Sequence, residues 1–333
     1  RDGPRAGAGG GRGGREFFPV GGTAVRRAGP LAYFPLPGGG AAGREPWRTA
    51  LAMAREAVGR EEAAAVAAEA WYGRPAARLQ LIGVTGTNGK TTSVILTRHV
   101  MSALWPMGAI GTLGCFDPAG EMVESEAGNL TTPGPIDLQA TLAALVDRGA
   151  AGVAMEVSSH SLDQGRVDGL MFRAAIFTNL TRDHLDYHET FEAYFAAKAK
   201  LVGYLADAGL AVVNADDAAW ARLPRTPRRI TFGGGNGKTR PDVSARDVHV
   251  DAQGARFQLV TEEGTHPVAL PLLGRFNVAN ALGVAACAVG LGVPAGAVAE
   301  RLSSAPPGPG RSGAGGGRPP GRAPGFSGSR GPR

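Results

Sequence analysis

From residue 79 onward, short apolar runs alternate with amphipathic stretches of helix length. This alternation is typical of βαβ units, in which helices connect the parallel strands of a sheet. The apolar spacing predicts strands at residues 80–85, 152–157, 174–180 and 210–214, and helices at residues 91–104, 137–148 and 190–205. The predicted fold class is α/β, with a mostly parallel sheet flanked by helices.

Three further segments have a regular period. Residues 248–260 alternate around a turn at 251–254, as a β-hairpin does. Residues 277–291 and the Ala-rich residues 46–72 have apolar positions at helical spacing. We therefore expect a hairpin and two helices in addition to the alternating core.

Both ends of the chain lack such a pattern. The first 45 residues are rich in Gly, Arg and Pro, and after Ser303 Phe326 is the only large apolar side chain. Segments of this composition cannot bury enough apolar surface to fold. We predict a partly disordered N-terminal piece at residues 1–70, a folded domain at 71–303 and a disordered tail at 304–333.

The formal net charge of +6 raises the question of nucleic-acid binding. The positive charge is concentrated in residues 1–30 and 304–333, and residues 31–303 are mildly acidic. A protein that binds the phosphate backbone carries its basic residues on one face of the fold. The charge distribution therefore argues against a nucleic-acid partner.

Composition also bears on the compartment. Cys115 and Cys287 are too few for a disulfide framework and match no paired metal-ligand spacing, which favours a reducing cytoplasm. The one long apolar stretch, residues 281–299, contains four Gly and Pro294. We expect a packed helix followed by a turn there, and no membrane span.

Residues 81–92 run from a strand through glycines into a helix that starts at a Lys-Thr pair. Gly86 and Gly89 allow a turn whose N–H groups face an anion, Lys90 can reach terminal phosphates, and Thr91 can bind magnesium. A glycine turn beside an unrelated lysine is the simpler alternative, but strand, loop, Lys-Thr pair and helix all occur in order. The predicted ATP-binding loop residues are Gly86, Thr87, Asn88, Gly89, Lys90, Thr91 and Thr92.

The spacing departs from the common P-loop, because Val84 stands where its first Gly should be. The sequence Gly-Thr-Asn-Gly-Lys-Thr-Thr instead resembles the form found in Mur ligases and the related folylpolyglutamate synthases. Six further segments resemble the Mur ligases that form the tripeptide, namely residues 130–133, 154–166, 177–188, 197–198, 214–217 and 273–281. Together with the loop they extend the resemblance over roughly residues 71–302.

A glutamate, Glu156, and a pair of histidines, His184 and His188, are considered for metal binding. Glu156 ends an apolar strand, so we expect it at the carboxyl edge of the sheet beside the phosphate loop, where a carboxylate suits magnesium. A solvated strand-end acid is the alternative. His184 and His188 are four residues apart but have no third soft ligand nearby, which argues against zinc. The resemblance implies that His184 binds a second magnesium ion and that His188 is a structural hydrogen bonder.

Lys198 by itself would be interpreted as a solvated helix lysine. The resemblance implies instead a lysine carbamylated by carbon dioxide, whose negative charge can approach a metal. The implied catalytic set is Lys90, Glu156, His184 and Lys198, with two Mg²⁺ ions bound by Thr91, Glu156, His184 and the Lys198 carbamate.

Other positions match substrate-binding residues of the family, although a turn or cap role is the simpler alternative for each hydroxyl. Thr131, Thr132, Ser158, Gln164 and Arg166 supply the donors that a ligand bearing carboxylates and phosphates needs. Asn277 and Asn280, at the start of a helix, resemble a pair that contacts ATP, with helix capping as the alternative.

The resemblance implies an ATP-dependent amide ligase of peptidoglycan synthesis. ATP would activate the free D-glutamyl carboxylate of UDP-N-acetylmuramoyl-L-alanyl-D-glutamate as an acyl phosphate, which the amino group of a diamino acid attacks. Diaminopimelate is favoured over lysine only as the commoner substrate, because the Asp-Asn-Pro-Arg motif of diaminopimelate users does not occur. We expect a monomer.

Two alternatives remain open. A folylpolyglutamate synthase shares the phosphate loop but is not expected to contain the stretch at residues 158–166. The second alternative is a non-catalytic fragment that binds a nucleotide. It stays open because the family's N-terminal uridine-binding domain is reduced here and its third domain is not apparent. We expect a truncation or a frameshift near Arg311 to account for both ends.

Overall fold

The computed structural model describes residues 61–124, 130–234 and 240–306, all of which belong to one compact unit of the chain. The predicted N-terminal piece, the first part of the helix at 46–72 and the predicted tail lie largely or wholly outside the described residues. The predicted domain boundaries at 70/71 and 303/304 therefore stay predictions.

Strands make up the centre of this unit. They are β1 (Gln80–Thr85), β2 (Met107–Gly111), β3 (Gly114–Phe116), β4 (Met122–Val123), β5 (Gly152–Glu156), β6 (Phe172–Phe177), β7 (Leu205–Asn214), β8 (Arg228–Gly233), β9 (Val243–Asp251), β10 (Gly254–Thr261) and β11 (Gly264–Leu270). Within the described residues they form one sheet in the order β11-β10-β9-β8-β7-β6-β1-β5-β2-β3-β4. The strands from β9 to β2 are parallel, and the outer pairs on both sides are antiparallel. The predicted mostly parallel α/β fold is confirmed.

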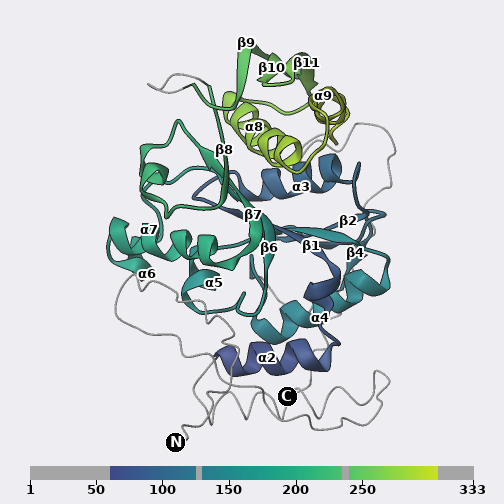
Figure 1. Cartoon of the computed structure of the whole chain (residues 1–333), viewed down its shortest axis with the longest axis vertical. Coiled ribbons are helices and arrows are strands. Elements are labelled where there is room, and N and C mark those ends of the chain that lie inside the picture. Colours follow the sequence, from purple (N-terminus) through teal and green to yellow (C-terminus); the bar gives the residue numbers. More distant parts are fainter. Residues whose placement is uncertain (1–60, 125–129, 235–239, 307–333) are drawn as a thin grey trace, which may run out of the picture. The chain divides into compact units, whose positions relative to one another are not determined.

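Helices cover both faces of the sheet (Figure 1). They are α2 (Glu61–Trp71), α3 (Lys90–Met101), α4 (Pro135–Asp147), α5 (Ser159–Asp163), α6 (Leu185–His188), α7 (Phe191–Ala199), α8 (Arg275–Gly290) and α9 (Ala295–Ser303), with 3₁₀ turns η2 (Pro75–Arg78), η3 (Lys200–Tyr204) and η4 (Ala218–Arg222). None of the helices in the described part of the chain has the length and apolar character needed to cross a bilayer.

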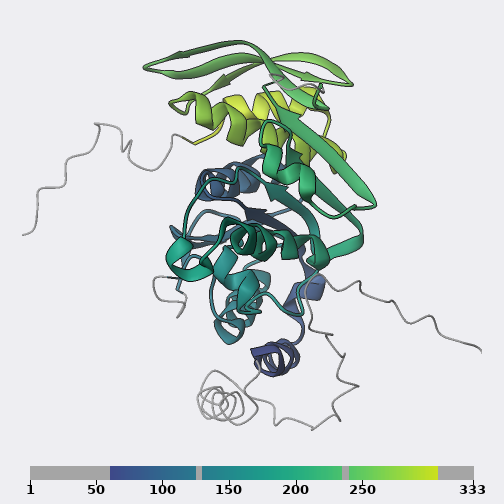
Figure 2. The same cartoon turned by 90° about the vertical axis from the view of Figure 1, so that its left-hand side faces the viewer.

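Each face of the sheet carries its own apolar core. Along β5, Val153 and Met155 pack into the core shared with α4 and α7, whereas Ala154 packs into the core shared with α3 and α8. Because side chains alternate along a strand, Glu156 faces the same side as Ala154 and α3. In Figure 2, strands β9–β11 lie over α8 and α9, at the end of the unit away from α4.

The predicted elements are confirmed with shifted ends. β6 stops at Phe177 and not at residue 180, because Thr178 and Asn179 leave the sheet and bond to the phosphate loop. The helix predicted at 190–205 ends at Ala199 and continues as η3. The apolar stretch 281–299 forms the end of α8, a turn and the start of α9, as expected.

Candidate nucleotide and metal site

The phosphate loop connects β1 to α3 through two glycines with positive φ. Gly86 has φ 146° and Gly89 has φ 85°, conformations that residues with a side chain rarely adopt. A Cβ on Gly86 would lie 1.9 Å from Thr178 Oγ1 and 2.9 Å from the Asn179 carbonyl oxygen. The loop therefore requires glycine both for its turn and for the close approach of the segment after β6.

Two N–H groups of this loop do not face an anion, which corrects part of the expected geometry. The Thr87 N–H donates to the Asn179 carbonyl at 2.7 Å, and the Asn88 N–H donates to Asn179 Oδ1 at 3.0 Å. The first turn of α3 has no intrahelical acceptors for its N–H groups, and these remain to face an anion at the positive end of the helix.

Asn179 was not among the predicted site residues, yet its side chain binds both backbone groups of Asn88 in the loop. Its Nδ2 donates to the Asn88 carbonyl at 3.0 Å while its Oδ1 accepts from the Asn88 N–H. Thr178 Oγ1 donates to the same carbonyl at 2.7 Å. No local signal marked this role, because it depends on contacts between segments about 90 residues apart.

Lys90 and Lys198 converge on one carbonyl oxygen. Lys90 Nζ donates to the carbonyls of Gly86 at 3.0 Å and Thr87 at 2.8 Å. Lys198, on α7, is 1% exposed, and its Nζ donates to the Gly86 carbonyl at 2.8 Å. Lys198 is therefore buried, and it is not the solvated helix lysine that the sequence around it would suggest.

Burial lowers the pKa of both amines, and repulsion from Lys90 adds to this effect at Lys198. Burial and, to a smaller extent, the charge of Lys90 lower the pKa of Lys198 to about 7, although Asp183 acts in the opposite direction. Burial also lowers the pKa of Lys90 below its ordinary value, although Glu156 and Asp183 oppose this. A substantial fraction of Lys198 is thus an uncharged amine near neutral pH.

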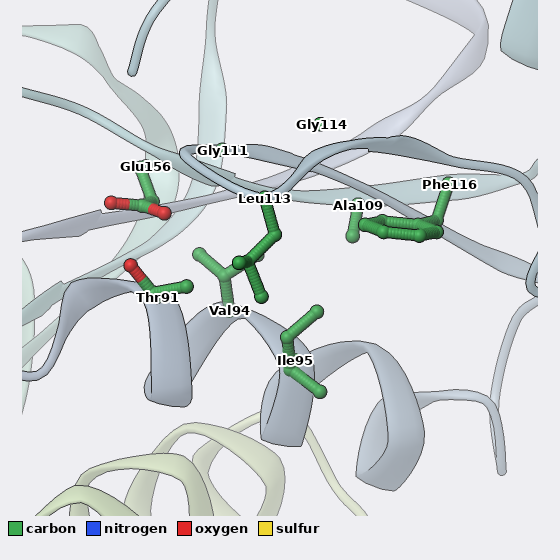
Figure 3. A pocket seen from close by; sticks show the side chains of 9 residues that line it. All are labelled: Thr91, Val94, Ile95, Ala109, Gly111, Leu113, Gly114, Phe116 and Glu156. Atoms are coloured by element: carbon green, nitrogen blue, oxygen red, sulfur yellow. The ribbon is translucent and has the colours of Figure 1, made fainter. Parts of the chain in front are cut away.

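Glu156 lies at the carboxyl end of β5, as predicted, but it is buried and not solvated. It is 1% exposed, and its Oε1 accepts from the Thr112 N–H at 2.9 Å. Figure 3 shows the Glu156 carboxylate and the Thr91 hydroxyl facing each other at one end of a small pocket, whose other lining residues are mainly apolar. Its charge also acts on Lys90, so these groups share one locality.

This donor set fits magnesium. Mg²⁺ takes oxygen ligands and is usually held by one or two carboxylates together with substrate phosphates. Within the described ranges, no three His, Cys, Asp or Glu side chains gather closely enough to hold a metal by themselves. Glu156 and the Thr91 hydroxyl supply oxygens beside a loop built for phosphates, which is the arrangement that such a shared site needs.

His184 lies on the loop after β6, at the start of α6. It has φ 50°, its Nε2 is 3.5 Å from Asp183 Oδ2, and its ring centroid is 4.9 Å from that of His160 and 6.3 Å from that of Tyr194. Tyr194 hydrogen bonds to Thr87 Oγ1 at 3.1 Å, which connects this region to the phosphate loop.

His188 does not act as the predicted hydrogen bonder through its buried nitrogen. Its Nε2 is buried without a hydrogen-bond partner among the described residues. Its ring instead packs against His160, Tyr187 and Tyr194, with centroids 4.8 to 5.5 Å apart. The role of His188 in the structure is packing.

The predicted substrate residues gather around the end of β5. Thr132 Oγ1 donates to the Glu156 carbonyl and accepts from the Ser158 N–H. Ser158 also caps α5, because its Oγ accepts from the Ser161 N–H, so the simpler capping role applies to it. Arg166 donates to Gln164 Oε1 and to the Thr132 carbonyl. Thr131 Oγ1 accepts from Thr112 Oγ1 at 3.2 Å, close to Glu156.

Asn280 lies against the phosphate loop from α8, and Asn277 bonds to it one turn earlier in the same helix. The N-cap of α8 is Gly274, so neither asparagine has the alternative capping role. The Asn280 amide donates to Asn277 Oδ1 at 3.0 Å, and a Cβ on Gly89 would lie 2.2 Å from Asn280 Oδ1. Both side chains are buried at the place where a nucleotide on the loop would meet α8.

Known proteins resemble this chain in both sequence and fold. It is 47% identical over 236 residues to the UDP-N-acetylmuramoyl-L-alanyl-D-glutamate–2,6-diaminopimelate ligase of Synechococcus elongatus, covering 70% of this chain and 46% of that protein. The protein of the same name from Xanthomonas campestris is 46% identical over 248 residues, covering 73% and 49%. The chain thus spans about half the length of the curated relatives it matches.

A solved structure of a ligase with that name is 34% identical, with a TM-score of 0.59, and the match covers 70% of this chain and 47% of that one. MurF from Acinetobacter baumannii has the same TM-score at 22% identity, over 75% and 51%, which shows the fold alone.

Two family models match the chain. A carbamoyltransferase, Kae1-like domain, second subdomain model matches residues 2–94, less than a third of the chain and mostly outside the described residues. The Mur ligase middle domain model matches residues 84–288, more than half of the chain, and includes the phosphate loop, Glu156, His184 and Lys198. The chain therefore belongs to the Mur ligase family.

Proposed function

We propose that this chain carries the catalytic core of an ATP-dependent amide ligase that adds a diamino acid to UDP-N-acetylmuramoyl-L-alanyl-D-glutamate in peptidoglycan synthesis. The curated relatives carry the name of such an enzyme. The observation that carries the proposal is the convergence of Lys90 and Lys198 on the Gly86 carbonyl, with the Glu156 carboxylate acting on Lys90.

A carboxylate does not acylate an amine in water, so it must first gain a leaving group. In the proposed reaction, an oxygen of the D-glutamyl side-chain carboxylate attacks the γ-phosphorus of ATP, and ADP leaves. The amino group of the diamino acid then attacks the acyl carbon, phosphate departs, and the amine loses a proton. Lys90 and the first turn of α3 stabilise the negative charge that gathers between the phosphates and the carboxylate.

Mg²⁺ would neutralise phosphate charge when bound. Glu156 and Thr91 would hold one of the two proposed ions, and His184 would bind the second together with the modified Lys198. Asn277 and Asn280 would hold the nucleotide from α8. The Thr112 N–H fixes the Glu156 carboxylate in place through Oε1.

We further propose that Lys198 is carbamylated. The nitrogen of its uncharged amine would bond to the carbon of CO₂ and release one proton, which leaves an anionic carbamate. Counted from the ammonium form, two protons are released and a cation becomes an anion. The buried position beside Lys90 supports this, because two adjacent ammonium groups repel each other and a carbamate next to Lys90 would form an ion pair. Intact-protein mass in bicarbonate should rise by one CO₂ for the wild type and not for Lys198→Met.

Thr131, Thr132, Ser158, Gln164 and Arg166 would bind the sugar nucleotide. Diaminopimelate is the proposed amino acid because it is the one in the names of the curated relatives. We expect the reaction to run in the cytoplasm, where ATP is made, and we expect a monomer.

Phosphate release tests this function. We expect release only when ATP, UDP-N-acetylmuramoyl-L-alanyl-D-glutamate and a diamino acid are all present, with meso-diaminopimelate preferred to L-lysine. Lys90→Met and Glu156→Gln should each lower the rate about 10²- to 10³-fold, whereas Glu300→Gln, an exposed residue of α9, should leave it unchanged.

Hydroxylamine provides a second readout of the first half-reaction, because it traps an acyl phosphate as a hydroxamate without an amino acid. Turnover with a folate in place of the sugar nucleotide would favour a folylpolyglutamate synthase. Binding of both substrates without phosphate release or hydroxamate would show a nucleotide-binding fragment.

A further inference from the structure

A chain of hydrogen bonds, which we name the Tyr187 relay, runs through Lys200, Asp163, Tyr187, Gln164 and Arg166. Lys200 Nζ donates to Asp163 Oδ1 at 2.7 Å, and the Tyr187 hydroxyl donates to Asp163 Oδ2 at 3.1 Å. Gln164 Nε2 donates to the Tyr187 oxygen at 3.2 Å, and Arg166 donates to Gln164 Oε1 through Nε at 2.9 Å and through Nη2. The relay thus connects η3 and α6 to the end of α5 and the segment that follows it.

The direction of every bond in the Tyr187 relay is fixed by chemistry. An ionised carboxylate only accepts, so the one proton of the Tyr187 hydroxyl points to Asp163, and its oxygen is left to accept from the Gln164 amide. Burial acts to raise the pKa of Asp163, but the bonds from Lys200 and Tyr187 outweigh it and the net pKa lies below the ordinary value. The Gln164 oxygen must therefore face Arg166.

Arg166 is the end of the relay that faces the site. Its Nη1 donates to the Thr132 carbonyl at 3.2 Å, and Thr132 Oγ1 donates to the Glu156 carbonyl. A guanidinium without a fixed partner samples many rotamers, and fixing it lowers the entropy that ligand binding must remove. The orientation of Gln164 thus decides how the Arg166 donors are presented.

Tyr187 is well placed for this because its ring is held independently of its hydroxyl. The ring centroid lies 4.2 Å from that of His160 and 4.8 Å from that of His188, while 39% of the residue remains exposed. Removing the hydroxyl should therefore leave the ring in place.

We propose that Tyr187 is a positioning residue whose hydroxyl orients the Gln164 amide, and through it the Arg166 guanidinium, for binding of the sugar-nucleotide substrate. This inference rests on the proposed function, in which Gln164 and Arg166 bind that substrate.

Titration calorimetry on Tyr187→Phe tests the inference. We expect the Kd for UDP-N-acetylmuramoyl-L-alanyl-D-glutamate to rise about tenfold, which corresponds to about 1.4 kcal/mol. The Kd for a non-hydrolysable Mg·ATP analogue should stay within about twofold. In a Gln164→Ala background, Tyr187→Phe should add little, because two residues that act through one another are not additive.

Tyr204→Phe is the matched control. The Tyr204 hydroxyl also donates to a carboxylate, that of Asp168, but its bond is not part of the relay. This variant should bind the sugar nucleotide as the wild type does.

Three results would overturn the inference alone: an unchanged Kd in Tyr187→Phe, a full tenfold effect in the Gln164→Ala background, or a parallel loss of ATP-analogue affinity and thermal stability, which would indicate a merely structural role. Failure of the wild type to bind the sugar nucleotide would instead overturn the proposed function, and the inference with it.

Discussion

The phosphate loop and the single-turn helix α6 both need positive φ angles, but they obtain them in different ways. The loop uses Gly86 and Gly89, which adopt such angles without a steric penalty. Helix α6 lies between His184, with φ 50°, and Glu189, with φ 61°, and each side chain costs of order 1 kcal/mol in that region.

The difference shows where each conformation is encoded. Glycine spacing specifies the loop locally, so the loop can be predicted from the amino-acid sequence alone. The α6 turn persists only because neighbouring contacts hold it: the Tyr187 hydroxyl bonds to Asp163, and the His188 ring packs against His160 and Tyr194. A strained His184 therefore belongs to a segment whose geometry is supplied by the tertiary fold.

The largest effect is expected from placing a side chain in the phosphate loop. Gly86→Ala would put a Cβ 1.9 Å from Thr178 Oγ1 and force the segment after β6 away from the loop. We expect nucleotide affinity to fall about 100-fold and unfolding free energy to fall by about 2–3 kcal/mol. Fluorescent ATP-analogue binding and urea unfolding measure these.

Gly73→Ala is the control for that prediction. Gly73 also has positive φ, 72°, but a Cβ there would have nothing within 4 Å. Only the backbone penalty of about 1 kcal/mol should appear, with unchanged nucleotide affinity. If Gly86→Ala behaved like Gly73→Ala, the close packing of the two loops would be wrong.

An intermediate effect is expected on the unfolding free energy, which should depend on pH through the protonation of Lys198. Its pKa is about 7 in the folded chain against 10.5 as the ordinary value. Between these values the unfolded chain binds more protons, so the unfolding free energy rises with pH, and below about pH 7 this dependence disappears.

Urea unfolding in CO₂-free buffer measures that slope. From pH 7 to 9 the wild type should gain about 1–2 kcal/mol relative to Lys198→Met, since one proton per molecule corresponds to at most about 1.4 kcal/mol per pH unit. Parallel curves for the two proteins would mean that Lys198 is not a buried amine.

The smallest effect is expected from relieving strain at the ends of α6. His184→Gly and Glu189→Gly should each raise the unfolding free energy by up to about 1 kcal/mol, because glycine adopts positive φ freely. Only His184→Gly should abolish phosphate release, since Glu189 has no proposed role. A loss of stability in both variants would show that α6 is not strained, and the comparison would fail.

The sequence predicted the elements with strong periodicity and missed the weak ones. Both ends of β1 were predicted correctly, and so was the turn of the β9–β10 hairpin. β3 and β4 span only three and two residues and have no period to detect. β8 begins with two exposed arginines, Arg228 and Arg229, which hide its apolar end.

The same division applies to the candidate site. Lys90, Glu156 and Lys198 were predicted as site residues. The two lysines donate to the same carbonyl and the Glu156 charge acts on Lys90, whereas their catalytic roles stay predictions. Asn179 and Tyr187 were not predicted, because an asparagine after a strand and a tyrosine in a short helix have no chemical signature of their own. Their roles depend on which segments the fold brings together.

The central claim is that the converging groups activate a carboxylate through an acyl phosphate. It is tested most directly with UDP-N-acetylmuramoyl-L-alanyl-D-glutamate labelled with ¹⁸O in the D-glutamyl side-chain carboxylate. The account predicts that each phosphate released in the presence of ATP and a diamino acid carries one ¹⁸O. Unlabelled phosphate would mean that water attacks ATP, and would contradict the ligase mechanism.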